Sequence, residues 1–180
     1  MNGVQLMGKD EIALALKDLA SRMVERHSSH EDIMLVGIQR RGADLERRLA
    51  GLAAAALGRD IALGTLDINL YRDDWSSIEG KPQIGQSCIP GTVDGRTVIL
   101  VDDVLFSGRT VRAALDALLD YGRPRVVELL VLIDRGHREL PIQADYAGRV
   151  VKTEPQEHVD VFLEERDGRD AVLLISPSAH

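Results

Sequence analysis

A short turn rich in Ser, Gly and Thr lies between an apolar run and a predicted helix, at residues 104–110. The N-terminus of a helix offers free backbone N–H groups and the positive end of the helix dipole, which together suit a phosphate monoester. Ser107 and Thr110 add hydroxyl donors, and Gly108 lets the backbone approach a ligand closely. This turn is therefore a candidate phosphate site.

Two consecutive acids, Asp102 and Asp103, stand directly before this turn, at the end of the apolar run TVILVD (97–102). Carboxylates do not bind phosphate, so they require another partner. Vicinal ribose hydroxyls, bound directly or through Mg²⁺, satisfy them. The whole stretch thus fits a ribose 5-phosphate.

A pair of cations, Arg40 and Arg41, follows the apolar run IMLVGI (33–38) and precedes Gly42. As surface charges at the start of a helix, they would oppose the helix dipole, which favours a functional role. A second charged group, Arg72, Asp73 and Asp74, equally suits a solvated cluster when taken alone.

Predicted strands and helices alternate around these groups. Helical spacing of apolar residues predicts helices over 9–27, 43–57 and 109–121, with Gly58 ending the second. Apolar or alternating runs predict strands over 33–38, 66–70, 97–102, 126–134, 147–151, 158–163 and 171–175, with an Asp167-Gly168 turn before the last. This pattern predicts an α/β fold, with a mainly parallel twisted sheet and helices on both faces. Ligands of such sheets bind beyond the carboxyl ends of the strands.

Residues 72–96 lose all periodicity and are rich in Gly and Pro. A loop this long is usually a functional lid or a disordered segment, so we expect a mobile loop that forms a hairpin when ordered. No repeat or second domain is evident, and we expect a single domain over residues 1–180.

Composition narrows the class of protein. The 180 residues are 44% apolar and 28% charged, which excludes a disordered or fibrous chain. A net charge of −7 and 3% aromatic residues disfavour a general nucleic-acid binder. The single cysteine, Cys88, excludes an intrachain disulfide and is expected to be buried. No targeting signal or membrane-length apolar run is present, so a soluble cytoplasmic protein is expected.

The stretch 98–110 resembles the 5-phosphoribosyl 1-diphosphate (PRPP) motif of type I phosphoribosyltransferases: four apolar residues, two acids and a V-x-x-[ST]-G-x-T turn. Together with VGIQRRGADLERRLA (36–50), LDINLYRDD (66–74) and LIDRGHRELPI (132–142), it resembles the PyrR family. Members of that family are bifunctional pyrimidine operon regulators and uracil phosphoribosyltransferases. The resemblance runs from about residue 6 to residue 175.

The resemblance implies that uracil and PRPP, with Mg²⁺, give UMP and diphosphate. It makes Arg41, Asp102 and Asp103 the catalytic residues, with Mg²⁺ reaching the two acids only through ribose or water. Arg40 and Arg41 would form the diphosphate loop, and Arg72, Asp73 and Asp74 the base of a hood loop. The substrate-binding residues implied are Arg40, Arg41, Asp102, Asp103, Val104, Leu105, Phe106, Ser107, Gly108, Arg109, Thr110, Arg135 and the backbone at Val159.

The base remains to be distinguished. Phe106 stands where 6-oxopurine enzymes carry an aspartate, and a phenyl ring exchanges no proton with a purine, which argues against hypoxanthine and guanine. A phosphoribosyltransferase for another base, such as orotate, is one alternative. A nucleotide-sensing RNA-binding attenuator with little or no catalysis is another.

The resemblance also implies a leader RNA as partner and a homodimer or higher oligomer. RNA-binding members carry Thr-Arg and His on the first helix, where this chain has Lys17, Asp18 and Ser21, and Asp18 would repel phosphate. The family's K-N-x-P-T-S stretch is also altered, at residues 149–154. These departures argue against sequence-specific RNA binding. A basic patch could still form from Arg123, Arg125, Arg138, Arg149 and Lys152.

Overall fold

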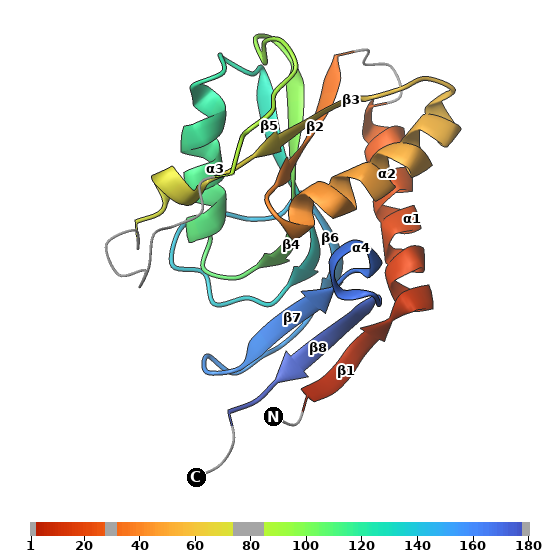
Figure 1. Ribbon diagram of the computed structural model, residues 1–180, viewed down its shortest axis with the longest axis vertical. Coiled ribbons are helices and arrows are strands. Elements are labelled where there is room, and N and C mark those ends of the chain that lie inside the picture. The colour runs from red at the N-terminus through yellow and green to blue at the C-terminus, as the bar shows by residue number, and fades with distance from the viewer. Residues whose placement is uncertain (1–2, 28–31, 74–84, 178–180) are drawn as a thin grey trace.

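The computed structural model describes residues 3–27, 32–73 and 85–177 (Figure 1). The elements are β1 (Gly3–Gly8), α1 (Lys9–His27), β2 (Ile33–Ile38), α2 (Arg41–Leu57), β3 (Ala62–Leu66), the 3₁₀ turn η1 (Asn69–Tyr71), β4 (Thr97–Leu105), α3 (Arg109–Leu119), β5 (Val126–Asp134), β6 (Tyr146–Val150), β7 (His158–Phe162), α4 (Glu164–Asp167) and β8 (Ala171–Ile175).

Five parallel strands form the main sheet, in the order β3-β2-β4-β5-β6. Successive side chains of a strand point to opposite faces, so each central strand contributes to two cores. Leu35 of β2 and Ile99 of β4 pack with α1 and α2, whereas Val36 and Leu100 pack with α3. The predicted α/β fold, with a parallel sheet covered on both faces, is confirmed.

A second sheet, antiparallel and three-stranded, has the order β1-β8-β7. It lies beyond the carboxyl end of β4 (Figure 1), and its buried residues Val161 and Val172 join the core under α1 and α2. The sequence analysis located β7 and β8 but not β1, because Gly3–Gly8 is short and has glycine at both ends, which weakens a strand signal. The small sheet therefore lies at the same end of the main sheet as the carboxyl end of β4 (Figure 1).

The predicted strand over 66–70 is wrong. The strand is Ala62–Leu66, which pairs with β2 from Met34 to Ile38. The alternation after Leu66 comes from a turn, in which the Asp67 carboxylate accepts a hydrogen bond from the Asn69 N–H at 2.9 Å while Ile68 is buried. The remaining predicted helices and strands lie within a few residues of the observed ones, the 97–102 strand extending to Leu105.

The loop predicted over 72–96 is described only at its two ends, and its middle, 74–84, lies outside the described residues. Cys88 pairs with Thr65 by two backbone hydrogen bonds of 2.8 Å, which fixes the end of the loop along β3. The expectation that Cys88 is buried is wrong: its thiol is free and exposed. A bridge at the open edge of β3 leaves that side chain in solvent.

Candidate active site

Most of the predicted functional residues lie at the carboxyl ends of β2 and β4. At this point the connections that follow the two strands lead to opposite sides of the sheet. β2 is followed by α2 and then by β3 on one side, whereas β4 is followed by α3 and then by β5 on the other. The carboxyl ends of two such neighbouring strands diverge and leave a crevice, which is where ligands of open parallel sheets bind. The segments Gln39–Gly42 and Asp102–Thr110 both begin at this crevice.

A cavity of about 260 Å³ occupies the crevice. Its lining includes Arg40, Arg41, Asp102 and Asp103, so two segments 62 residues apart in the chain meet there. Arg72 also lines it.

An adjoining cavity of about 530 Å³ shares two lining residues, Arg72 and Thr110, with the first. Phe106, Ser107 and Arg109 of the turn at 104–110, here called the phosphate turn, also line it. Asp73 at the start of the hood loop and Glu139, which follows β5, complete the lining. Because they share Arg72 and Thr110, the two cavities are adjacent, and their linings together include residues predicted to contact the diphosphate, the ribose and the phosphate.

The Arg40–Arg41 segment is held tightly against β4. The Gln39–Arg40 peptide bond is cis, and the carbonyl of Arg40 accepts the Ala43 N–H at 3.2 Å. A Cβ on Gly42 would lie 2.3 Å from the carbonyl oxygen of Val101, so only glycine allows this approach. Arg40, at the N-cap of α2, makes no side-chain capping bond, which leaves the cap open to a ligand.

The two acids lie at different depths. Asp102 is buried and Asp103 is half-buried. Asp102 Oδ1 accepts the N–H of Asp103 at 2.9 Å, and Asp103 Oδ1 accepts the N–H of Val104 at 2.9 Å. Burial raises the pKa of the Asp102 carboxyl well above its ordinary value, and the neighbouring Asp103 charge raises it further. Burial likewise raises the pKa of Asp103, against the lowering effect of Arg41. Hydroxyl donors or a cation would stabilise this pair in its ionised form.

The phosphate turn is supported from behind. Its carbonyls accept outside donors: that of Phe106 accepts Arg138 Nη1 at 3.0 Å, and that of Ser107 accepts the Glu139 N–H at 2.9 Å. Gly108 has φ +90°, a conformation that favours glycine, and α3 has no side-chain cap at its N-terminus. The first-turn N–H groups of α3 have no intrahelical partner and suit an anion. The sequence analysis did not identify Arg138 as the support of this turn, because the contact bridges 32 residues.

Arg135 and Val159 do not line these two cavities. Arg135 is buried, and its guanidinium lies over the Phe106 ring at 4.1 Å from the centroid, so it contacts the site through that ring. It also lines a third cavity of about 590 Å³ with His137 and Lys152. Val159 lies in β7 with its side chain buried. Because β7 is an edge strand of the small sheet, one side of its backbone has no strand partner within the described residues.

The hood-loop residues are described only in part. Arg72 lines both cavities and Asp73 lines the larger one, and Asp74 lies outside the described residues. Asp73 Oδ2 accepts Arg109 Nη1 at 2.6 Å, and Arg109 also donates through Nε to Glu139 at 2.5 Å. This bridge fixes the start of the hood loop to the phosphate turn.

Comparison with known proteins is decisive about the family. Residues 5–166 match the family described as phosphoribosyl transferase domain. The Bifunctional protein PyrR of Pelotomaculum thermopropionicum is 48% identical over 171 residues, which is 95% of this chain and 94% of that one. The Bifunctional protein PyrR of Desulfosudis oleivorans is 54% identical over 160 residues, 88% of each chain. The chain belongs to the PyrR family.

Solved structures place this chain in the type I phosphoribosyltransferase fold. A hypoxanthine phosphoribosyltransferase of Trypanosoma cruzi, in a ternary complex with substrates, superposes with a TM-score of 0.74 over 95% of this chain and 94% of that one, at 19% identity. A Bacillus anthracis hypoxanthine-guanine phosphoribosyltransferase gives 0.67 over 97% and 98%, at 19% identity. At such identities the likeness establishes the fold alone.

The candidate site offers few metal ligands among the described residues. Within the described residues, no three His, Cys, Asp or Glu side chains gather as a metal cage. Asp102 and Asp103 remain, and Mg²⁺ is commonly held by one or two carboxylates with substrate oxygens and water. The site therefore fits a Mg²⁺ ion that arrives with a phosphorylated substrate.

The basic patch considered from the sequence does not form as one surface. Arg123 and Arg125 precede the nine-residue strand β5 and Arg138 follows it, so they lie roughly 30 Å apart at opposite ends of the strand. The Arg138 guanidinium donates to the Asp134 carboxylate and to the backbone carbonyls of Phe106 and Ile142, so it is not available to RNA. No helix of the described segments is long and apolar enough for a membrane span.

Proposed function

We propose that this chain transfers the 5-phosphoribosyl group of PRPP to uracil, giving UMP and diphosphate. One observation carries the proposal: Arg40, Arg41, Asp102 and Asp103 line one cavity, which adjoins a second one lined by the phosphate turn. The two arginines match the diphosphate of PRPP, the two carboxylates match its ribose, and the phosphate turn matches its 5-phosphate.

The chemistry asks the protein for positioning and charge stabilisation. The bond from C1 of the ribose to the diphosphate oxygen breaks as the bond from C1 to uracil N1 forms, and the N1 proton is released. C1 acquires oxocarbenium character in between, as in glycoside cleavage. Mg²⁺, when bound with PRPP, would neutralise the diphosphate, and Asp102 and Asp103 would hold it through ribose oxygens or water.

The protein groups have separate tasks in this scheme. Asp102 and Asp103 accept hydrogen bonds from the ribose hydroxyls. Arg41 and the backbone of its loop bind the departing diphosphate, and the Val104–Thr110 turn binds the 5-phosphate. A ligand that supplies donors to the two acids favours their ionised form, which burial disfavours in the free protein. No side-chain nucleophile is required.

Uracil is the base that the surroundings of Phe106 favour. The Arg135 guanidinium covers one face of the Phe106 ring, at 4.1 Å from the ring centroid. The phenyl ring has no acidic or basic group that could exchange a proton with a purine. We place the uracil edge against the backbone of β7 near Val159, where peptide N–H and C=O groups pair with uracil N3–H and carbonyls.

Mutation of the ribose contact tests the proposal. Asp103→Asn keeps an Oδ1 acceptor for the Val104 N–H but removes the charge, so UMP formation from uracil and PRPP should fall more than about tenfold. Rates near those of the unchanged protein would refute the ribose assignment.

A regulatory role, with leader RNA as partner and UMP as signal, is the second candidate, because the relatives are named bifunctional. The first helix does not favour it: Asp18 pairs with Arg22 at 3.3 Å and neutralises that cation. A gel shift with the transcript's own leader, with and without UMP, tests it. RNA binding that depends on UMP, without turnover, would establish the attenuator in place of the enzyme.

A further inference from the structure

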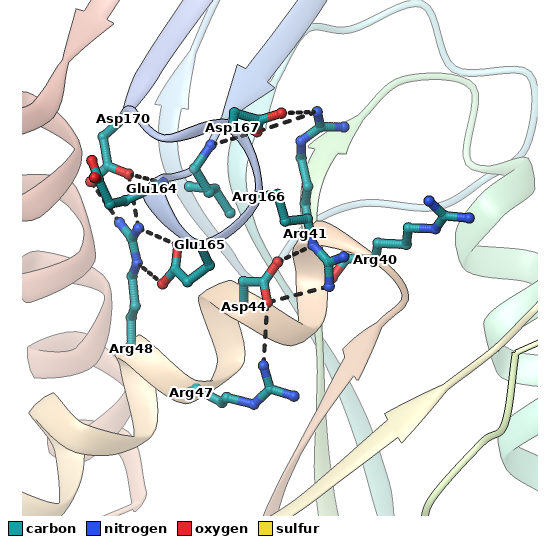
Figure 2. A network of polar contacts seen from close by, with 11 residues as sticks. Arg40, Arg41, Asp44, Arg47, Arg48, Glu164, Glu165, Arg166, Asp167 and Asp170 are labelled. Carbon is teal, nitrogen blue, oxygen red and sulfur yellow. Dashed lines mark hydrogen bonds and ion pairs between the residues drawn. The ribbon is translucent and has the colours of Figure 1, made fainter.

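An acidic turn, residues 164–170, contacts the start of α2 beside the candidate diphosphate loop. Figure 2 shows the network of side chains between them. At its outer end, Arg48 of α2 donates to both oxygens of Glu165, at 2.8 and 2.6 Å, and to both oxygens of Asp170, at 2.8 Å each. Paired two-pronged contacts of this kind fix the acidic turn on α2.

At the inner end, Arg166 contacts the loop itself. Its Nε donates to the carboxylate of Asp44, which is buried, and its Nη2 lies 3.4 Å from the carbonyl oxygen of Arg40. The Arg40 side chain points away from this network (Figure 2), so the contact is with the loop backbone. The acidic turn therefore supports the cis peptide region from outside the cavity.

The neighbouring Asp167 contacts a side chain that lines the cavity. Arg41 Nη2 lies 3.3 Å from Oδ1 and 3.4 Å from Oδ2 of Asp167 (Figure 2). Asp167 Oδ2 also accepts the backbone N–H of Leu163 at 2.9 Å, so the carboxylate is fixed by its own turn. That N–H, and then the charge of Arg41, hold the pKa of Asp167 below its ordinary value, so it is ionised at neutral pH.

Arg41 keeps donors that these contacts do not use. Its Nε is buried and has no hydrogen-bond partner within the described residues, although it belongs to a cation. Arg41 also lines the cavity of Asp103 and lowers the pKa of that acid. A buried cationic donor without a partner costs stability. The Arg41 side chain as a whole is 38% exposed, so its outer N–H groups are accessible to a ligand oxygen.

We propose that Asp167 is a positioning residue, which fixes Arg41 through one nitrogen so that its remaining N–H groups meet the diphosphate of PRPP. The inference rests on the proposed function, because it needs a diphosphate in the cavity. It predicts the direction in which the affinity for diphosphate changes when Asp167 is replaced. Removing a negative charge beside an anion site would by itself strengthen diphosphate binding, whereas loss of a positioning contact weakens it.

The test is the affinity of the full-length protein for diphosphate and for PRPP, each with Mg²⁺, measured by calorimetry. Asp167→Asn should weaken both by roughly fivefold or more and raise the KM for PRPP to match, with kcat and the KM for uracil changed less than about twofold. Asn keeps an acceptor for the Leu163 N–H, so the turn itself is preserved.

Two further variants separate position from charge and from folding. Asp167→Glu keeps the charge but moves it by one methylene, and it should also weaken diphosphate binding. Glu165→Gln is the matched control: it removes one charge from the same turn, loosens Arg48 only, and should leave diphosphate affinity unchanged.

Unchanged or stronger diphosphate binding by Asp167→Asn would overturn the positioning role, as would an equal loss in Glu165→Gln. In an Arg41→Ala background, Asp167→Asn should have no further effect, and an additional loss there would also contradict the proposal. Failure of the unmodified protein to bind PRPP would instead contradict the proposed function.

Discussion

Gly42→Ala tests how closely the diphosphate loop depends on its contact with β4. The added Cβ would lie 2.3 Å from the Val101 carbonyl oxygen and 3.3 Å from the Asp102 Cα. Non-bonded heavy atoms pack at about 3.5 Å, so α2 and β4 would have to separate by about 1 Å. The other side of the helix start gives no room, because a Cβ on Gly37 would lie 2.4 Å from the Ala43 Cα.

The expected cost follows from this overlap. Overpacking of a rigid contact typically destabilises a protein by about 1–3 kcal/mol. At this chain length, each kcal/mol lowers the midpoint of thermal unfolding by about 2–4 °C. The loop carrying Arg41 moves with the helix start, and a displacement of about 1 Å costs about 100-fold in catalytic efficiency.

Gly51→Ala is the internal control, since it lies on the same helix with nothing within 4 Å of the added Cβ. It should stabilise the protein by about 0.5–1 kcal/mol through helix propensity and leave UMP formation unchanged. Thermal unfolding and kcat/KM for PRPP, measured on both variants, test whether the close contact at Gly42 is needed for stability and activity. If Gly42→Ala is as stable and as active as Gly51→Ala, the argument from close packing is refuted.

Two further predictions concern stability against pH and the phosphate turn. Burial raises the pKa of Glu46 to about 7, while an exposed glutamate titrates near 4.3. The folded protein then binds a proton that the unfolded chain has lost, so this group costs stability as pH rises from about 4.3 through about 7. Glu46→Gln keeps an acceptor for the Gly64 N–H and should raise the unfolding free energy at pH 8 by about 1–3 kcal/mol. The gain should vanish below about pH 4 in urea titrations, and a constant gain at every pH would contradict the assignment. Gly108→Ala places a side chain at φ +90°, at a strain of about 1–2 kcal/mol, and should raise the KM for PRPP while leaving the KM for uracil unchanged. Equal changes in both KM values would show that the turn does not bind the phosphate.

The parallel sheet was predictable because its strands are short apolar runs with helical periodicity between them. Residues 33–38 and 126–134 are confirmed at both ends, and the helix over 9–27 likewise. The strand over 66–70 was wrong because alternation arises equally from a buried Ile68 within a turn. β1 was not predicted because it is only 6 residues long and begins and ends with glycine, which weakens a strand signal.

The composition of the candidate site was predictable where function depends on contiguous residues, as in the Asp102–Thr110 stretch. What could not be predicted depends on distant pairing. Arg138 supports the phosphate turn across 32 residues, and Asp167 meets Arg41 across 126. Local sequence identified Asp167 only as part of a turn, because nothing within the turn indicates what its carboxylate contacts.

The central claim is that the crevice between β2 and β4 transfers phosphoribose to uracil. The most direct measurement is nucleotide formation from PRPP and Mg²⁺ with uracil, orotate and hypoxanthine in parallel, resolved by chromatography. The account predicts UMP from uracil, no product from the other two bases, and loss of the uracil reaction in Asp103→Asn. A nucleotide formed from orotate or hypoxanthine but not from uracil, or no turnover with any base despite binding of PRPP, would contradict it.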